Sequence, residues 1–336
     1  MEQLSYLTML KPTGHIHLGN YVSVIQTMKE LSKHPKNILF LGIADYHAIT
    51  NHQDPNKLNN NIYHLILTWL SSIPDVEKKI NDNQIYIYRQ SNIPQIFELF
   101  WIMSCYTAKG LCNRNHTYKH LSSNNNLKSN DPDKNIFMGL FNYPVLMSAD
   151  ILLFNTDYIP LGPDQKQHLE MSRDIANKFN HIFKTNILKQ PKGYFIDKSI
   201  EGYDGRKMSK SYNNTIPIIS SEKKLRKNIF KIKTNSKTNE SKYENESPLL
   251  DIYKYFSNKN KYNELLNKMG FGLQWKEIKE IIFNSINEEL KGINDKYKYF
   301  DDHKNVVYKL LNNSEYHLKQ IAKSQLDKIK YTIGIN

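Results

Sequence analysis

The sequence predicts an α/β fold: a parallel sheet with helices between its strands, followed by an all-helical part. Two observations lead to this prediction. Through roughly the first 200 residues, short apolar runs alternate with segments of helical periodicity, the order that β–α–β units produce. After residue 214, only helical patterns remain. We therefore expect a first domain over residues 1–214 and a helical domain over residues 215–336.

The strands of the first domain are expected where short apolar runs occur, because strands of a parallel sheet are buried on both faces. Four runs of this kind are present: Leu4–Leu10, Ile38–Ala44, Gln84–Tyr88 and Tyr158–Leu161. Helical patterns separate and follow them: His17–Leu31, a helix that begins at Asp54 and Pro55, Pro94–Cys105 and Gln165–Phe179. Asp54 supplies an N-cap, and Pro55 suits the first helical turn.

Residues 122–135 interrupt this order. They consist of Ser, Asn, Lys and Asp with almost no apolar side chain, so we expect a mobile surface loop there. The helical domain contains three helical segments: Leu249–Phe256, Tyr262–Met269 and Leu273–Leu290. A final helix is indicated by an apolar stripe: Val307, Leu311, Leu318, Ile321, Ala322 and Ile329.

Charge and cysteine content narrow the class of protein. The 336 residues carry a net charge of +13 at pH 7, which suits an anionic macromolecular partner, although a biased base composition would explain the many lysines equally well. Cys105 and Cys112 are too few for a disulfide framework or a four-ligand metal site, so a reducing, cytoplasmic setting is expected. No apolar run approaches the roughly 20 residues of a membrane span, and no signal-peptide pattern is present.

The segment Lys11–Asn20, called the first turn below, follows the first expected strand and opens a helix. Free backbone N–H groups and the helix dipole favour phosphate at such a place. Gly14 allows a tight turn, and Gly19 leaves room for a flat base. His17 and Asn20 share one helix face, where both can donate hydrogen bonds to phosphate or ribose oxygens. A match of this length also arises by chance.

The second candidate is the segment Gly205–Ser211, called the cationic loop below. Lys207 and Lys210 lie three residues apart among small hydroxyl side chains. Such a loop can close over a departing pyrophosphate and neutralise charge as it develops. On its own, the loop is better explained as a solvated basic linker, because the whole chain is rich in lysine.

The combination of these two segments resembles the HIGH-type and KMSKS-type signatures of the class I aminoacyl-tRNA synthetases. Three further segments are similar to the tryptophanyl-tRNA synthetase family: Phe40–Thr50, Tyr143–Leu153 and Pro160–Glu170. The resemblance extends from about Leu7 to the last helices. It implies a Rossmann-like sheet, ATP-dependent activation of L-tryptophan with Mg²⁺ accompanying ATP, and transfer to tRNA(Trp). It also implies a homodimer that meets through a helical insertion at about residues 94–135, and a C-terminal domain that binds the anticodon arm.

The resemblance also implies roles for individual residues. Three residues would act in catalysis: His17, Lys207 and Lys210. ATP would contact these lysines and the following residues: Lys11, Pro12, Thr13, Gly19, Asn20, Gly162, Pro163, Asp164, Ile196, Met208, Ser209 and Ser211. Tryptophan would contact five side chains: Asp150, Tyr143, Met147, Gln165 and His47. Apolar walls would come from Ala44, Ile159 and Leu161.

Asp150 is the residue on which specificity would depend. It lies in an otherwise apolar stretch, where burial strands a charge unless a donor is present. The indole N–H of tryptophan is the donor that the resemblance implies. A helix-capping role, or an internal ion pair with an Arg or Lys, is the alternative that the residues alone leave open.

The chain departs from the family pattern at three positions. Met9 and Lys11 stand where relatives commonly carry Gly and Gln, and Leu121 stands where a second lysine often follows Arg114 and Lys119. No cysteine follows Cys112, so neither a cysteine-ligated iron–sulfur cluster nor another protein-bound metal is expected. Two rival functions remain: the tyrosine enzyme, which shares both signatures, and a non-catalytic RNA-binding relative.

Overall fold

A five-stranded parallel sheet forms the centre of the first domain, and the sequence predicts the parallel sheet and four of its strands. The computed structural model describes residues 3–50, 54–127, 131–162, 165–196, 198–234 and 247–335. The strands lie in the order β3-β2-β1-β4-β5. Their bounds are β1 Ser5–Leu10, β2 Ile38–Ile43, β3 Ile85–Arg89, β4 Tyr158–Leu161 and β5 Lys192–Phe195. Because the order reverses between β1 and β4, a crevice opens at the carboxyl ends of these two strands.

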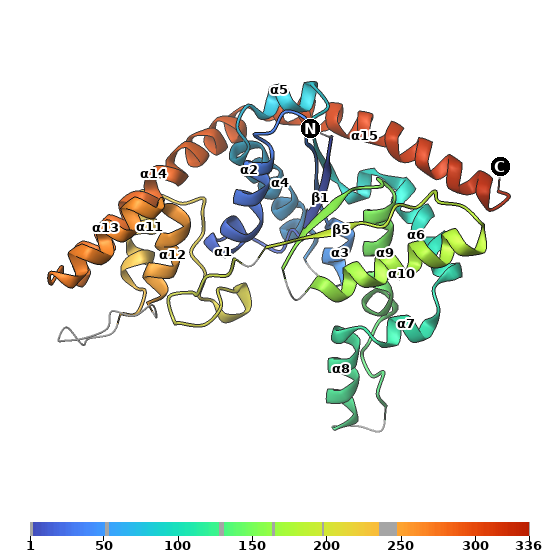
Figure 1. Ribbon diagram of the computed structural model, residues 1–336, viewed down its shortest axis with the longest axis horizontal. Helices are drawn as coiled ribbons and strands as arrows, with labels where there is room; N and C mark the ends of the chain where they lie inside the picture. Colours follow the sequence, from blue (N-terminus) through green and yellow to red (C-terminus); the bar gives the residue numbers. More distant parts are fainter. Residues whose placement is uncertain are drawn as a thin grey trace.

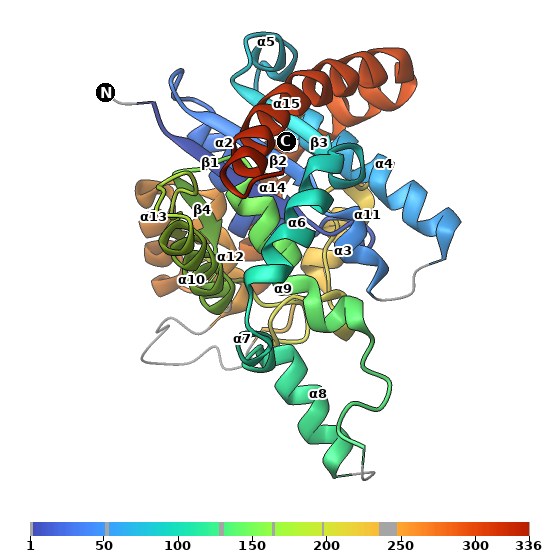
Figure 2. The ribbon, with the colours of Figure 1, turned by 90° about the vertical axis from the view of Figure 1, so that its right-hand side faces the viewer.

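Helices cover both faces of the sheet (Figures 1 and 2). Those of the first domain are α1 Leu18–Asn20, α2 Gln26–Leu31, α3 Asp45–Ile49, α4 Pro55–Ser72, α5 Val76–Asn81, α6 Pro94–Tyr106, α7 Lys109–Asn113, α8 His116–Asn126, α9 Met138–Leu152 and α10 Lys166–Ile182. The four helices that the sequence predicts in the first domain are confirmed. They lie after β1, after Asp54, from Pro94 and after Gln165. As expected, Asp54 caps α4, since its carboxylate accepts from the backbone N–H groups of Asn56 and Lys57.

The predicted helix His17–Leu31 is present, with one irregularity. Between α1 and α2, the segment Tyr21–Ile25 is a π-helix (η1), so the chain stays helical from Leu18 to Leu31. Tyr21 is buried, and its hydroxyl donates to Glu289 of the C-terminal part. Lys29 pairs with the same carboxylate at 2.7 Å. The helix that opens at the first turn is therefore tied to the helical domain by buried and half-buried polar contacts.

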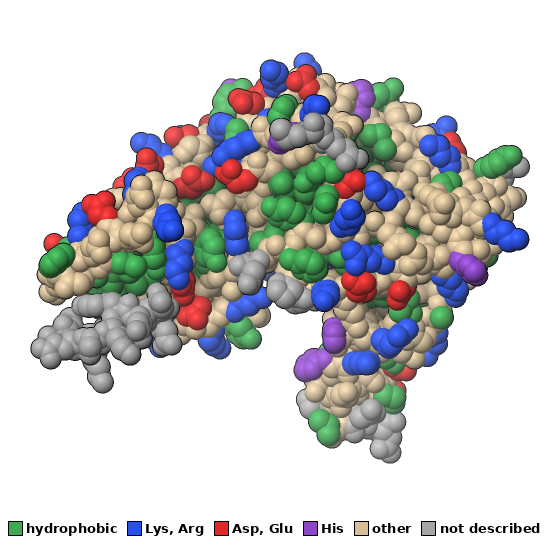
Figure 3. Space-filling view, in the orientation of Figure 1, with side chains coloured by type: hydrophobic (Ala, Val, Ile, Leu, Met, Phe, Trp, Pro, Cys, Tyr) green, Lys and Arg blue, Asp and Glu red, His purple; other side chains and the backbone are tan. Residues whose placement is uncertain are grey.

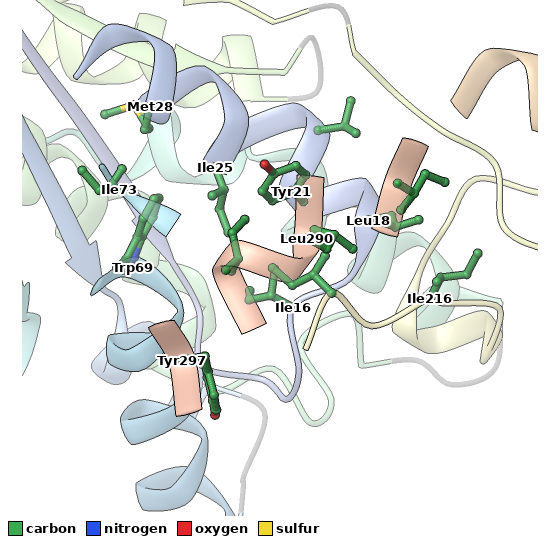
Figure 4. Close-up of a cluster of buried hydrophobic side chains, with 14 of the residues drawn as sticks. Ile16, Leu18, Tyr21, Ile25, Met28, Trp69, Ile73, Ile216, Leu290 and Tyr297 are labelled. Carbon is green, nitrogen blue, oxygen red and sulfur yellow. The ribbon is translucent and has the colours of Figure 1, made fainter. Parts of the chain in front are cut away.

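The apolar core beneath the first turn joins both parts of the chain (Figure 4). Leu18 and Ile25 pack in it with Trp69 of α4 and with Leu290 and Tyr297 of the C-terminal helix α14, Trp275–Asp302. Burial of a large aromatic side chain contributes roughly 4–6 kcal/mol as an upper estimate. This packing makes the first turn a rigid platform.

The C-terminal part is all-helical, as predicted. Its helices are α11 Glu222–Phe230, α12 Pro248–Phe256, α13 Lys259–Gly270, α14 and α15 Lys304–Thr332. Helix α15 turns back and packs against β3, α5 and α6 of the first domain. There Glu315, which is buried, accepts from the guanidinium of Arg89 at 2.9 Å. The last helix thus braces the sheet, and the division at residue 214 stays a prediction.

Two details of the predicted pattern are wrong. Residues 122–126 are not loop, because α8 continues through them to Asn126 and is capped at its start by Asn115. Polar side chains are compatible with an exposed helix, so composition alone did not exclude one. Ile321 does not face inward with the stripe of α15, since it is 37% exposed. Within the described ranges, no helix combines the length and apolarity needed to cross a membrane.

Candidate active site

A cavity of about 1120 Å³ opens at the carboxyl ends of β1 and β4. Ligands of open α/β sheets bind at such a reversal of strand order. Most of the predicted site residues line this cavity: Lys11, His17, Gly19, Asn20, Ala44, His47, Tyr143, Met147, Asp150, Ile159, Leu161, Gly162, Gln165, Ile196, Lys207 and Met208. Of the other predicted residues, Pro163 and Asp164 lie outside the described residues. The remaining predicted residues do not line the cavity but are close in sequence to residues that do: Pro12, Thr13, Ser209, Lys210 and Ser211.

At one end of the cavity, His17 caps α1, the short helix at the end of the first turn. The backbone N–H of Asn20 donates to Nδ1 of His17 at 3.3 Å. Burial, and next the charge of Lys210, lower the pKa of His17 to about 4. The imidazole is therefore neutral at pH 7, and because Nδ1 accepts, its proton lies on Nε2. His17 offers one N–H donor to the cavity and no positive charge.

The cationic loop docks on the first turn through Met208. This side chain is buried, and its sulfur accepts from the backbone N–H of Gly19 at 3.4 Å. A Cβ at position 19 would lie 3.0 Å from Nδ1 of His17 and 3.5 Å from Cβ of Met208. The distance to Met208 is an ordinary contact, whereas the distance to His17 is tight, so a side chain at position 19 would press on the His17 ring.

Lys210 ties the loop to the other side of the same turn. Its ammonium group donates to the carbonyl of Gly14 at 3.0 Å and to the hydroxyl of Thr13 at 3.4 Å. Burial lowers the pKa of Lys210 to about 8. Lys207 lines the cavity itself. The two lysines thus lie in different places, one within the cavity and one across its edge.

Asn214 organises the loop from behind, a role that sequence reasoning missed. Its buried amide donates to Asp204 at 2.7 Å and to the carbonyl of Arg206 at 3.2 Å, and it accepts from the backbone N–H of Ser209 at 2.8 Å. The next residues pair with the first turn, since the N–H of Leu18 donates to the carbonyl of Ile216 at 2.9 Å. The loop is held at both of its ends.

At the other end of the cavity, Asp150 is buried on α9. Nε2 of His47 lies 2.9 Å from its Oδ2, and Nε2 of Gln90 lies 2.9 Å from Oδ1 and 3.1 Å from Oδ2. Burial raises the pKa of Asp150, and the contacts with His47 and Gln90 partly offset this. Its partners are thus a histidine and an amide, and neither is the Arg or Lys that the alternative interpretation required.

Tyr143 also lines the cavity, beside the helix α8. Its hydroxyl contacts Nδ2 of Asn115 at 3.1 Å, Oγ1 of Thr117 at 3.2 Å and Nε2 of His168 at 3.3 Å. The ammonium group of Lys11 lies 5.6 Å from the centre of its ring, a cation–π distance. This cluster joins α8, α9 and α10 around the mouth of the cavity. Among the residues that the structure describes, no group of His, Cys, Asp and Glu side chains could hold a metal ion.

Comparison with known proteins agrees with the geometry. The profile of the class I tRNA synthetases (W and Y) matches residues 1–291. The tryptophan–tRNA ligase of Neisseria meningitidis is 39% identical over 340 residues, covering 100% of this chain and 99% of that protein. The crystal structure of tryptophanyl-tRNA synthetase from Campylobacter jejuni, complexed with ADP and tryptophan, superimposes with a TM-score of 0.83. That protein is 34% identical, with 98% of this chain and 100% of that chain covered.

Proposed function

The chain belongs to the class I tRNA synthetases for tryptophan and tyrosine, and we infer that it is a tryptophan–tRNA ligase. It activates L-tryptophan with ATP to give tryptophanyl-adenylate and diphosphate, and it then transfers the aminoacyl group to tRNA(Trp) with release of AMP. Tryptophan–tRNA ligases are similar to it over its whole length. In the structure, the buried carboxylate of Asp150 lines the cavity and suits an indole N–H. Because a phenol O–H is also a donor, the choice of tryptophan over tyrosine rests on these relatives.

The first step needs positioning and charge neutralisation more than proton transfer. The tryptophan carboxylate is already an anion when it attacks the α-phosphorus of Mg·ATP, and diphosphate leaves. Lys207, which lines the cavity, and Lys210, at its edge, supply positive charge for the leaving group. His17 supplies a neutral Nε2–H donor from the base of the turn. The contacts of ATP with Lys11 and with Gly162 belong to the same proposal.

Tryptophan occupies the other end, with its indole at Asp150 and Met147. Tyr143 and Gln165 also line the cavity and would contact the amino and carboxylate groups. His47 contributes through Asp150, because its ring nitrogen faces that carboxylate. The cavity then has a carboxylate at the indole end and lysines at the phosphate end. The negative side chain faces the indole N–H of tryptophan, and the positive side chains face the phosphates of ATP.

The tRNA substrate is proposed to cross the concave face between α8 and the C-terminal helices, where Lys and Arg side chains lie around a hollow (Figure 3). Residues 215–336 would contact the anticodon arm. Helix α11 exposes Lys223, Lys224 and Lys227, whereas Arg226 is already paired with Glu280 at 2.6 Å. Lys224 lies close enough to His15 to lower its pKa, after burial and His64. This lysine therefore lies near the first turn.

Dimerisation is the second part of the proposal, with the helical insertion at the interface. Large apolar side chains are exposed in and beside residues 94–135: Trp101, Leu127, Phe137 and Met138. Apolar groups of this size at a surface are typical of an interface between subunits. We expect the dimer to act in the cytoplasm, where tRNA is charged.

Pyrophosphate exchange with each of the twenty amino acids in turn tests the function. We expect ATP–diphosphate exchange with tryptophan and with no other amino acid at comparable concentration. Exchange with tyrosine would favour the rival enzyme. Absence of exchange with any amino acid, in protein that still binds tRNA, would favour the non-catalytic RNA-binding alternative.

A further inference from the structure

Gln90 contacts two polar residues that line the cavity, His47 and Asp150. It is fully buried and begins the short turn η2, Gln90–Asn92, at the carboxyl end of β3. Its Oε1 accepts from the backbone N–H of His47 at 3.4 Å, and its Nε2 donates to Asp150. A flipped amide would place two donors face to face at His47 and two acceptors face to face at Asp150. The orientation of the amide is therefore fixed by its partners.

Among the residues that the structure describes, the contacts at Asp150 leave one acceptor position open. An ionised carboxylate offers about four lone-pair positions on its two oxygens. Gln90 takes one on Oδ1 and one on Oδ2, and Nε2 of His47 takes the second on Oδ2. The remaining position is on Oδ1, and Asp150 lines the cavity. We propose that Gln90 is a positioning residue for substrate specificity, which holds the Asp150 carboxylate so that the open position of Oδ1 meets the N–H of the substrate ring.

The loss of Gln90 has a defined consequence. The terminal torsion of an aspartate side chain is broad, so a carboxylate held by His47 alone has more freedom to turn. Burial already favours its neutral form, and the Gln90 amide opposes this. Without the amide, the carboxylate is a less oriented and weaker acceptor toward the cavity. The effect should therefore fall on the substrate N–H and leave the other substrate contacts in place.

The inference rests on the proposed function, and a pair of substrates tests it. Tryptophan is compared with its analogue in which sulfur replaces the ring N–H, by kcat/KM in pyrophosphate exchange with full-length enzyme. The variants are Gln90→Ala and Gln90→Met, the second preserving volume in case the first packs poorly. We expect kcat/KM for tryptophan to fall about tenfold to 100-fold, and that for the analogue to stay within about threefold.

Asn92→Ala is the matched control. Asn92 lies on the same turn, and its amide also donates to a buried carboxylate, that of Glu315, outside the cavity. We expect it to leave the preference for tryptophan over the analogue unchanged. If Asn92→Ala reduces that preference as much as the Gln90 variants do, the effect belongs to the turn as a whole and the proposal is wrong.

Two further results separate this inference from the proposed function. Equal losses for tryptophan and analogue in folded Gln90→Met would show a purely structural role and overturn the inference. Asp150→Ala provides the reference: if it abolishes the preference while the Gln90 variants retain it, only the role of Gln90 fails. If Asp150→Ala itself retains the preference, the proposed indole contact fails, and the role of Gln90 fails with it.

Discussion

Lys210 allows a quantitative test of the catalytic role of the cationic loop. Burial against the first turn lowers the pKa of this lysine to about 8, so its charge is lost within an accessible pH range. With that pKa, about nine-tenths of the side chains are charged at pH 7 and about one-tenth at pH 9. If the ammonium group neutralises the leaving diphosphate, kcat/KM for ATP should fall about tenfold between these two pH values.

The matched variant is Lys210→Arg. A guanidinium stays charged above pH 12, so the alkaline fall near pH 8 should disappear, whatever the absolute rate of the variant. In the parent, kcat should decline at higher pH than kcat/KM, because bound phosphates stabilise the ammonium form. Both profiles are measured by pyrophosphate exchange from pH 6.5 to 9.5. An unchanged fall near pH 8 in Lys210→Arg would refute the reasoning, since another group would then carry the titration.

The lowered pKa of Lys210 also makes the free energy of unfolding depend on pH. Below pH 8, Lys210 is charged in both the folded and the unfolded chain, and burial of its ammonium group opposes folding. Between pH 8 and the ordinary lysine pKa of about 10.4, the unfolded chain binds more protons, so the contribution of Lys210 becomes more favourable as pH rises. Lys210→Met should remove this pH-dependent part of the free energy of unfolding, measured in urea.

Three further predictions concern other parts of the site. Asp150→Ala should lower kcat/KM for tryptophan at least about 100-fold, on the order of 3 kcal/mol, and near-parental kinetics would remove Asp150 from the pocket. Gly19→Ala should slow adenylate formation in single turnover by roughly tenfold or more with little change in tryptophan Kd, because its Cβ would meet the ring of His17; an equal loss in Kd would show a wider disturbance. Replacement of the exposed Lys223 and Lys227 of α11 by Gln should weaken tRNA binding and lower the slope of log K against log salt by roughly 0.7–0.9 per lost phosphate contact. Pyrophosphate exchange should stay within about threefold of the parent. An unchanged slope would show that these lysines are solvated and do not contact tRNA.

The parts of the fold that sequence predicted are those where one physical cause dominates. Strands β1 to β4 are apolar runs buried in the sheet, and the capped start of α4 is a local signal. Strand β5 was missed because it is an exposed edge strand, whose short sequence has no apolar continuity. The packing of α15 against β3 was missed for another reason. An apolar stripe predicts which face of a helix is buried, but not the element against which that face packs.

The same distinction applies to the site. Resemblance to a family assigned the residues that would touch substrate, because such residues occur in short linear motifs. It did not find Gln90 or Asn214, which act on the motifs from other segments of the chain. A buried Gln directly after an apolar strand was a signal that could have been used, since a buried amide requires partners. Its partner, Asp150, is distant in sequence and could only be found in three dimensions.

The two ends of the cavity place different physical requirements on their side chains. Asp150 must remain an acceptor although burial disfavours its charge, and a fixed set of donors on rigid elements achieves this. The lysines must respond to charge that appears only during the reaction, which suits a loop that docks through one thioether and one ammonium group. The first turn belongs to the phosphate end, because it is anchored in the core shared with α14 and also receives the loop. Discrimination and catalysis can therefore be altered separately by substitution: changes around Asp150 should act on which amino acid is activated, and changes around Met208 and Lys210 on how fast.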